Sequence, residues 1–429
     1  MLCPYPHCGG DVPPSRSATY CTKCGLPAFF CPRCNAPNRA FARFCRACRG
    51  TESSISFPPT HAKNLDFESL SKRPKSFVIE DSFWTAPIAH CGSLWCLSLN
   101  GVVWKVSPVG PPPTHFATLG EDFGQAPFII RYVTTGKESG QIPFLFAANT
   151  RAVKSVNLLT REVKEIASVA DGETILSSLA QTYSTIETYG NSLYFLKAAK
   201  GKVLIESRGL LDNSVKSYVI KDLGVVGPFR IGNRLASYSR KALQLIEKDR
   251  IVEHSFLNGF TAWVNPGEMV TVQPAAGRMP YVTTGDSVYI PGAKGSTPGL
   301  LYMPLDASGA FIAFKEEASY SDAENGSLVV ARKGRLALYR GLSAVEVSKD
   351  TELIARGPSY HHEPVTIGFA KTAGGVESLR FYYEQRMMDH PLSEFTGFQD
   401  GLRVCQVGGT VVFAYLNENN NIGMSVWGC

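Results

Sequence analysis

Paired cysteines at the spacing of metal ligands occupy the first 48 residues of the chain. Eight of the twelve cysteines lie there, as one Cys-x4-Cys pair and three Cys-x2-Cys pairs. The pairs are Cys3 and Cys8, Cys21 and Cys24, Cys31 and Cys34, and Cys45 and Cys48. A Cys-x2-Cys turn places two sulfurs on one side of a tight backbone knuckle, and two knuckles complete a tetrahedral zinc site. We therefore expect thiolates to bind two structural Zn²⁺ ions.

Pairing in chain order gives two sites. The first consists of Cys3, Cys8, Cys21 and Cys24, and the second of Cys31, Cys34, Cys45 and Cys48. Gly9 and Gly25 follow knuckle cysteines, where positive φ lets backbone N–H groups turn toward the sulfurs. This order resembles the double zinc ribbon family over residues 1–50. The resemblance implies two small ribbons with one zinc ion each. The x4 spacing after Cys3 departs from the family pattern.

Two other interpretations of the cysteine block remain open. His7 could replace Cys3 or Cys8 as a ligand, although four thiolates already complete a site. A disulfide or redox cluster is the second alternative, disfavoured if the chain stays in a reducing compartment. Catalytic zinc is disfavoured because four protein ligands leave no open position for water. The remaining Cys91, Cys96, Cys405 and Cys429 have no ligand spacing, so we assign them no role.

The composition is that of an ordinary globular protein, with 44% hydrophobic and 19% charged residues. The sequence contains no apolar run of the 18 or more residues that a membrane span needs. Its first residues lack the basic start and apolar middle of a secretory signal. We therefore expect a cytoplasmic protein with reduced thiols and no membrane partner.

Positive charge is concentrated in residues 1–50. This block has seven basic residues against the single acid Asp11, a formal charge of +6, which is also the charge of the whole chain. Two zinc ions with eight thiolates would lower it to about +2, because each such site carries −2. Arg39, Arg43, Arg46 and Arg49, interleaved with phenylalanines, could bind nucleic acid or simply solvate the ribbon. We favour the second interpretation.

After the cysteine block, residues 51–75 are polar and proline-containing and predict a linker. From residue 76 onward, short apolar or alternating runs are broken by Gly, Asn, Asp and Pro, which is typical of an all-β region. A turn followed by a strand, a second turn and a second strand recurs eight times. The anchor residues of these hairpins are Leu94, Leu145, Leu193, Leu235, Val288, Leu328, Thr366 and Val411.

The interval between these anchors is close to the length of a four-stranded propeller blade, about 40 to 50 residues. We therefore predict a mainly-β protein in which residues 76–429 form a seven- or eight-bladed β-propeller, with eight preferred. This region resembles WD-repeat-like and quinoprotein-like propellers in architecture, without their Gly-His and Trp-Asp signatures. A pair of β-sandwiches is the rival fold. The last blade lacks one strand, so we expect residues 76–80 to pair with it and close the ring.

The sequence has no motif that indicates catalysis. It lacks G-x-S-x-G, H-E-x-x-H and Walker-type patterns, and we expect no enzyme, although a site in the propeller centre remains a third possibility. Outside the cysteine block, the one cluster of ligand-type residues is His361-His362-Glu363, which we interpret as a solvated loop. We expect a zinc-binding adaptor or scaffold that binds other proteins. The alternative is a nucleic-acid-binding protein that uses the Arg-rich ribbons and recruits partners through the propeller.

Overall fold

The structure is a computed structural model, and it is built almost entirely of β-strands. It describes residues 1–4, 11–12, 18–20, 27–31, 34–39, 45, 47–48, 75–83, 88–90, 93–106, 113–134, 141–176, 186–220, 224–247, 250–264, 281–284, 287–305, 309–314, 319–322, 328–332, 335–348, 351–356, 366–371, 377–383, 386–391, 398–407, 410–419 and 421–427. One short 3₁₀ turn, η2 (Glu121–Phe123), interrupts the strands of this part of the chain. The predicted mainly-β class is confirmed.

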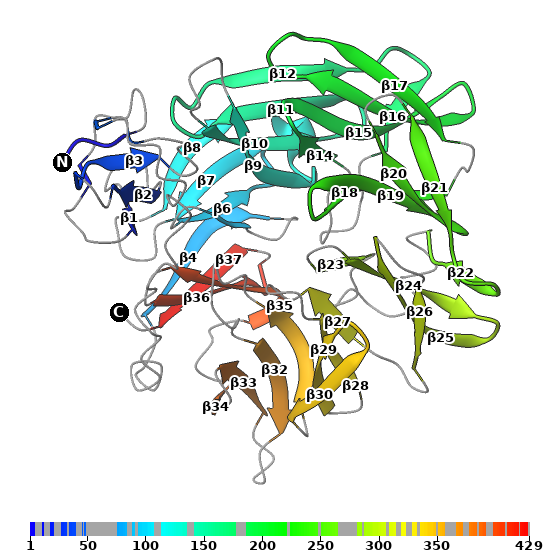
Figure 1. The fold of residues 1–429 in the computed structure, drawn as a ribbon. Helices are drawn as coiled ribbons and strands as arrows, with labels where there is room; N and C mark the ends of the chain where they lie inside the picture. Colours follow the sequence, from blue (N-terminus) through cyan, green and yellow to red (C-terminus); the bar gives the residue numbers. More distant parts are fainter. Residues whose placement is uncertain are drawn as a thin grey trace.

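Within the described residues, eight antiparallel sheets of four or five strands stand around a ring (Figure 1). Sheet 1 is β5 (Ile88–His90), β6 (Ser93–Leu97), β7 (Val102–Val106) and β8 (Thr114–Thr118); sheet 2 is β9 (Phe128–Thr134), β10 (Gln141–Ala148), β11 (Ala152–Asn157) and β12 (Val163–Ser168). Sheet 3 is β13 (Glu173–Ile175), β14 (Ile186–Tyr189), β15 (Ser192–Ala199), β16 (Lys202–Gly209) and β17 (Val215–Ile220); sheet 4 is β18 (Val225–Ile231), β19 (Arg234–Ser239), β20 (Ala242–Ile246) and β21 (Ile251–Ser255).

The second half of the ring continues the same pattern. Sheet 5 is β22 (Phe260–Ala262), β23 (Val282–Thr284), β24 (Ser287–Lys294), β25 (Thr297–Pro304) and β26 (Ala310–Ala313); sheet 6 is β27 (Ser319–Asp322), β28 (Leu328–Arg332), β29 (Arg335–Arg340) and β30 (Ser343–Ser348). Sheet 7 is β31 (Thr351–Arg356), β32 (Thr366–Lys371), β33 (Glu377–Tyr383) and β34 (Arg386–Pro391); sheet 8 is β35 (Phe398–Val407), β36 (Thr410–Asn417), β37 (Asn421–Trp427) and β4 (Lys75–Ser82). This is the architecture of a β-propeller.

Burial along the strands follows from this arrangement. Strands in the middle of a sheet are covered on both faces by the neighbouring sheets, so β6 and β20 are buried at every position. Strands at the outer edge expose most of their residues, as β12 does. Apolar clusters fill the junctions between adjacent sheets, for example Phe146 with Phe195 between sheets 2 and 3. The core is therefore a series of interfaces arranged around the ring.

The ring closes without a free end. Neighbouring innermost strands contact one another around the full circle, in the order β5, β9, β14, β18, β23, β27, β31, β35 and back to β5. In sheet 8, β4 pairs antiparallel with β37, with Ile79 opposite Ile422 and Phe77 opposite Met424. The pairing of residues 76–80 with the C-terminal sheet, expected from the sequence, is present. This pairing joins the two ends of the ring. Ile79 of β4 and Met424 of β37 belong to one hydrophobic cluster that holds β4 in place.

A separate three-stranded sheet lies before the ring in sequence, in the order β1 (Ala18–Tyr20), β2 (Pro27–Phe30) and β3 (Pro37–Arg39). It lies beside sheets 1 and 2 in Figure 1. The central strand β2 separates the two predicted cysteine sets, and β1 and β3 pair with its two edges. The two predicted ribbons therefore share one sheet.

Several predicted features fall outside the described residues. They are the linker up to residue 74, the cluster His361-His362-Glu363, and the side chains of Arg39, Arg43, Arg46 and Arg49. Cys96, by contrast, is fully buried in the core, as is Trp95. Across the described residues, no helix has the length and apolar character needed to cross a membrane.

Candidate metal centre

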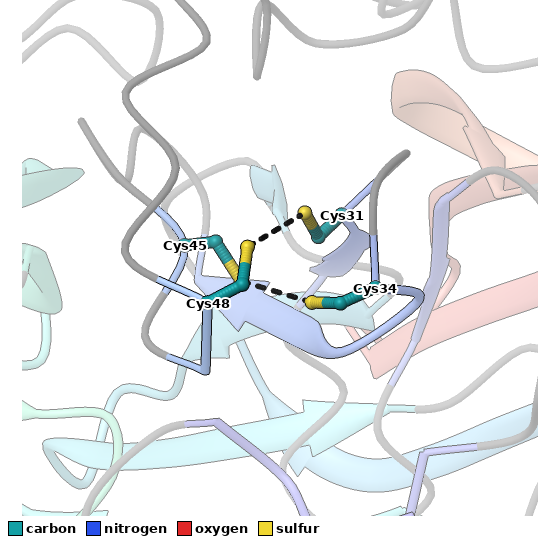
Figure 2. Close-up of side chains that lie close together, drawn as sticks. All are labelled: Cys31, Cys34, Cys45 and Cys48. Carbon is teal, nitrogen blue, oxygen red and sulfur yellow. Dashed lines mark hydrogen bonds between the residues drawn. The ribbon is translucent and has the colours of Figure 1, made fainter.

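The structure brings together the second predicted set of cysteines. The sulfurs of Cys31, Cys34, Cys45 and Cys48 all lie within 4.8 Å of one another (Figure 2). Cys31 directly follows β2, Cys34 lies in the turn before β3, and Cys45 and Cys48 come from the segment after β3. Cys31 and Cys45 are buried, whereas Cys34 is exposed. Two knuckles, one on each side of β3, therefore face each other.

The sulfur spacing fits a four-coordinate metal ion. Sulfurs at the corners of a tetrahedron with metal bonds of about 2.3 Å lie about 3.8 Å apart. The Cys31 and Cys48 sulfurs are separated by 3.7 Å, and the Cys34 and Cys45 sulfurs by 3.5 Å. These distances are well beyond the S–S bond length of about 2.05 Å in a disulfide. The cluster can hold one metal ion through four thiolates.

The first knuckle is shaped by the backbone around Cys31. The Cys31 N–H donates to the Ala36 carbonyl at 2.9 Å, and the Asn35 N–H donates to the Cys31 carbonyl at 2.8 Å. Asn35 has a φ of 54°, a left-handed conformation that asparagine tolerates better than most residues. Asn35 follows Cys34 as Gly9 and Gly25 follow their own cysteines. Glycine is the usual residue at positive φ, so the sequence alone gave no signal for an asparagine in this role.

Asn38 supports the cluster from β3. Its side-chain amide donates to the Ala36 carbonyl at 2.8 Å and lies 3.5 Å from the Cys45 sulfur. The residue is 2% exposed, so its amide is fixed by the turn on one side and the thiol on the other. Outer hydrogen bonds of this kind orient metal ligands and stabilise their charge. A polar residue with no ligand spacing gave no signal for this role in the sequence.

The local electrostatics favour a thiolate at Cys45. Burial opposes ionisation, but the backbone N–H groups of Cys48 and Ala47 and the Asn38 amide outweigh it and lower the pKa of Cys45 to about 6. At Cys34 the Ala36 N–H acts in the same direction, yet desolvation and the three neighbouring thiols raise the pKa of Cys34 above its usual range. A cation bound among the sulfurs would relieve this mutual repulsion.

The first predicted set is described only at Cys3. Cys8, Cys21, Cys24 and the alternative ligand His7 lie outside the described residues. Cys3 itself is half-buried and packs against a small apolar cluster of Val12, Ala28 and Phe30. The second metal site of the double ribbon therefore remains a prediction.

The same apolar cluster holds the N-terminal sheet against the ring. Tyr132 of β9 and Leu159, in the turn between β11 and β12, pack against Val12, Ala28 and Phe30. Phe30 is adjacent in sequence to the metal-cluster residue Cys31. The metal centre is thus one residue away from the contact that docks it on sheet 2.

His90 of β5 contacts Tyr132, one of the residues in this docking contact. Its ring lies 5.1 Å from the Tyr132 ring, centroid to centroid, and it is 7% exposed. Its Nε2 atom lacks a hydrogen-bond partner among the described residues. Burial, helped by the nearby Arg131 charge, lowers the pKa of His90 to about 4, so the imidazole is neutral near pH 7. Arg131 in turn pairs with Glu187 of β14 through two hydrogen bonds of 2.7 Å.

Comparison with known proteins finds distant similarity in fold only. No protein-family model and no curated protein sequence matches this chain. Among solved structures, the AfRom2 CNH domain is 10% identical, with 82% of this chain and 98% of that one covered and a TM-score of 0.37. YCF48 bound to a D1 peptide is 10% identical, with 69% and 92% covered and a TM-score of 0.39. Hsv2p of Kluyveromyces lactis is 8% identical, with 70% and 97% covered and a TM-score of 0.33. At these values the similarities assign no function.

Proposed function

We propose that this protein is a non-enzymatic scaffold in which a zinc-stabilised double ribbon and a β-propeller together bind other proteins. The observation that carries the proposal is the cluster of Cys31, Cys34, Cys45 and Cys48, whose spacing suits a tetrahedral metal site. Four thiolate ligands favour Zn²⁺ and leave no coordination position for substrate, which gives the metal a structural role. A second zinc ion would occupy Cys3, Cys8, Cys21 and Cys24.

The docking of the ribbons on sheet 2 supports a rigid scaffold. A flexible tether would let the ribbons and the propeller move independently. It would help binding only by raising the effective concentration of one module near the other module's partner. Here Phe30 and Val12 pack against Tyr132 and Leu159. Ribbon and propeller would therefore present one continuous surface with a fixed geometry to a partner.

A non-enzymatic role is the simplest account of the described side chains. In this part of the chain, the cysteine set is the one group of three or more His, Cys, Asp or Glu residues close enough to hold a metal ion. The ion pairs of these residues lie within one sheet, as Glu206 does with Lys197 and Arg208, or join two sheets, as Arg131 does with Glu187. These pairs satisfy one another and offer no free nucleophile or base.

Native mass spectrometry of the full chain purified from its own host tests the proposal. We expect two zinc ions and a retained protein partner. The Cys45→Ser variant should lose one zinc ion, while a Cys96→Ala variant, altered at a buried cysteine outside the cluster, should keep both. Retained nucleic acid with steep salt dependence would favour the Arg-rich ribbon as a nucleic-acid reader instead. Absence of zinc would refute the metal-binding part of the proposal.

A further inference from the structure

The turn docked against the ribbons has a structural counterpart in the next sheet of the ring. The turn after β11 in sheet 2 and the turn after β16 in sheet 3 have the same shape and carry the same leucine pair, Leu158-Leu159 and Leu210-Leu211. In each turn, the residue three positions after the first leucine has a positive φ although it is not glycine: Arg161 at 65° and Asn213 at 54°. Leu211 in sheet 3 therefore corresponds to Leu159 in sheet 2.

Matching backbone hydrogen bonds establish this correspondence. In the sheet 2 turn, they run from the N–H of Asn157 to Glu162 O (2.9 Å), from Leu158 to Pro143 O (3.0 Å) and from Arg161 to Asn157 O (2.9 Å). In the sheet 3 turn, they run from the N–H of Gly209 to Ser214 O (2.8 Å), from Leu210 to Asn191 O (2.8 Å) and from Asn213 to Gly209 O (3.1 Å).

The two leucines differ in what covers them. Leu159 is partly buried because it packs against the apolar cluster of the ribbons. Leu211 is 50% exposed, although it occupies the equivalent place one sheet further along the ring. A single exposed leucine is ordinary on a protein surface, so only its surroundings can indicate a binding site at Leu211.

An apolar groove lies beside Leu211, between sheets 2 and 3. Its volume is about 230 Å³, and Phe144, Phe146, Ile166, Leu210 and Leu211 supply most of its apolar lining. Val215 and Val219 of β17 are 51% and 56% exposed. They share the sheet 3 face of Leu193 and Phe195, the face packed against sheet 2, because Val215 pairs with Arg208 and Arg208 with Leu193. The groove and this exposed apolar edge belong to one junction.

The size of the groove indicates what it can take. Pockets for cofactors and drug-sized ligands are typically about 300 to 1,000 Å³. A cavity of about 150 Å³ already holds a benzene ring. A groove of about 230 Å³ therefore suits one bulky apolar side chain better than a free cofactor.

We propose that the junction of sheets 2 and 3 around Leu211 is a protein-docking site that takes a partner segment with a bulky aliphatic or aromatic side chain. At sheet 2, the equivalent Leu159 already packs against the apolar ribbon cluster of Val12, Ala28 and Phe30. Exposed Lys164 and Glu162 flank the groove and can hydrogen-bond the backbone of such a segment. This inference deepens the proposed scaffold function and rests on it, because it names one surface that binds the partner.

Selection from a displayed library of random linear peptides against the full-length protein tests this site. We expect the enriched peptides to share one Phe, Trp, Leu or Ile, and to bind by fluorescence polarisation. The Leu211→Glu variant should weaken that binding at least tenfold. The Leu342→Glu variant is the matched control, because Leu342 is 57% exposed in a turn of sheet 6; it should bind as the unaltered protein does.

Several results would overturn the site. These are a lack of enriched peptides, binding unaffected by Leu211→Glu, and binding weakened equally by Leu342→Glu. A protein that is dimeric by light scattering and becomes monomeric in Leu211→Glu would assign the groove to a second copy instead. Leu211→Ala keeps the test interpretable if the charged variant misfolds. If a native partner still co-purifies with Leu211→Glu, the scaffold function stands and this surface is wrong.

Discussion

The N-terminal sheet and the ring are stabilised by different means. The described apolar core of the N-terminal sheet consists of three buried residues, Val12, Ala28 and Phe30. A single junction of the ring, between sheets 1 and 2, buries fifteen. Because so small a core offsets little of the conformational entropy of folding, we expect the ribbons to depend on a bound metal and the ring to fold without one. Perturbing each region should therefore leave the other largely intact.

Removing a metal ligand should produce the largest local effect. Cys45→Ser removes a buried thiolate that Asn38 and two backbone N–H groups stabilise, and structural zinc sites contribute on the order of 10 kcal/mol of folding free energy. We expect residues 27–48 to become sensitive to protease while the ring keeps its melting temperature. Limited proteolysis with mass spectrometry measures both.

The control for this prediction is Cys96→Ala, which alters a fully buried cysteine of β6. It should lower the stability of the ring and leave the ribbons resistant. If the metal-free ribbons stayed resistant to protease, packing on sheet 2 rather than metal would hold them.

A cavity in the core of the ring should destabilise the ring and leave the metal site intact. Leu145 of β10 is fully buried between sheets 1 and 2. Leu145→Ala should lower the free energy of unfolding by about 4 kcal/mol through lost burial and the remaining cavity. Zinc content by elemental analysis should not change. Simultaneous loss of zinc would contradict the independence of the two regions.

The junction between the two regions should respond to pH through His90. Its folded pKa of about 4 is below the usual unfolded value of about 6.5, so the unfolded state binds the extra proton first. Its contribution to stability is fully present above pH 6.5 and is lost as pH falls toward 4, by on the order of 3 kcal/mol. Below pH 4 the contribution stays constant. Urea denaturation across this range measures it.

Two variants isolate the histidine. His90→Phe keeps a ring against Tyr132 and should flatten the pH dependence between 6.5 and 4. His115→Gln, which alters an exposed imidazole of β8 next to Thr118, is the control substitution. An equal slope in unaltered protein and His90→Phe would show that other groups set the acid sensitivity.

Much of the ring was predictable because its strands follow a sequence period. All eight hairpin anchors lie in the second strand of a sheet, from Leu94 in β6 to Val411 in β36. That strand is covered on both faces, so it must be apolar, and a turn must precede it in each repeat. The pairing of β4 with β37 followed from a missing strand in the last repeat.

The features that sequence analysis missed depend on contacts between distant segments. The spacing of four cysteines predicts their cluster, but no spacing rule links Asn38 to Cys45. Tyr132 and Leu159 look like ordinary strand and turn residues, and only the fold places them against Phe30. The shared Leu-Leu pair of the two turns is visible in the sequence, but the backbone hydrogen bonds are needed to establish that Leu159 and Leu211 occupy equivalent positions.

Loosening the docking contact should produce the smallest effect, and it tests directly whether the two regions are independent. Tyr132→Ala removes a half-buried ring that packs against the ribbon cluster without touching the sulfurs. Partial burial limits the loss to about 1 kcal/mol, so amide exchange in β2 should accelerate by about fivefold at unchanged zinc content. Tyr132→Phe keeps the ring, so amide exchange in β2 should accelerate less than in Tyr132→Ala. If Tyr132→Ala instead released zinc, the metal centre would depend on sheet 2, and the two regions would form one cooperative unit.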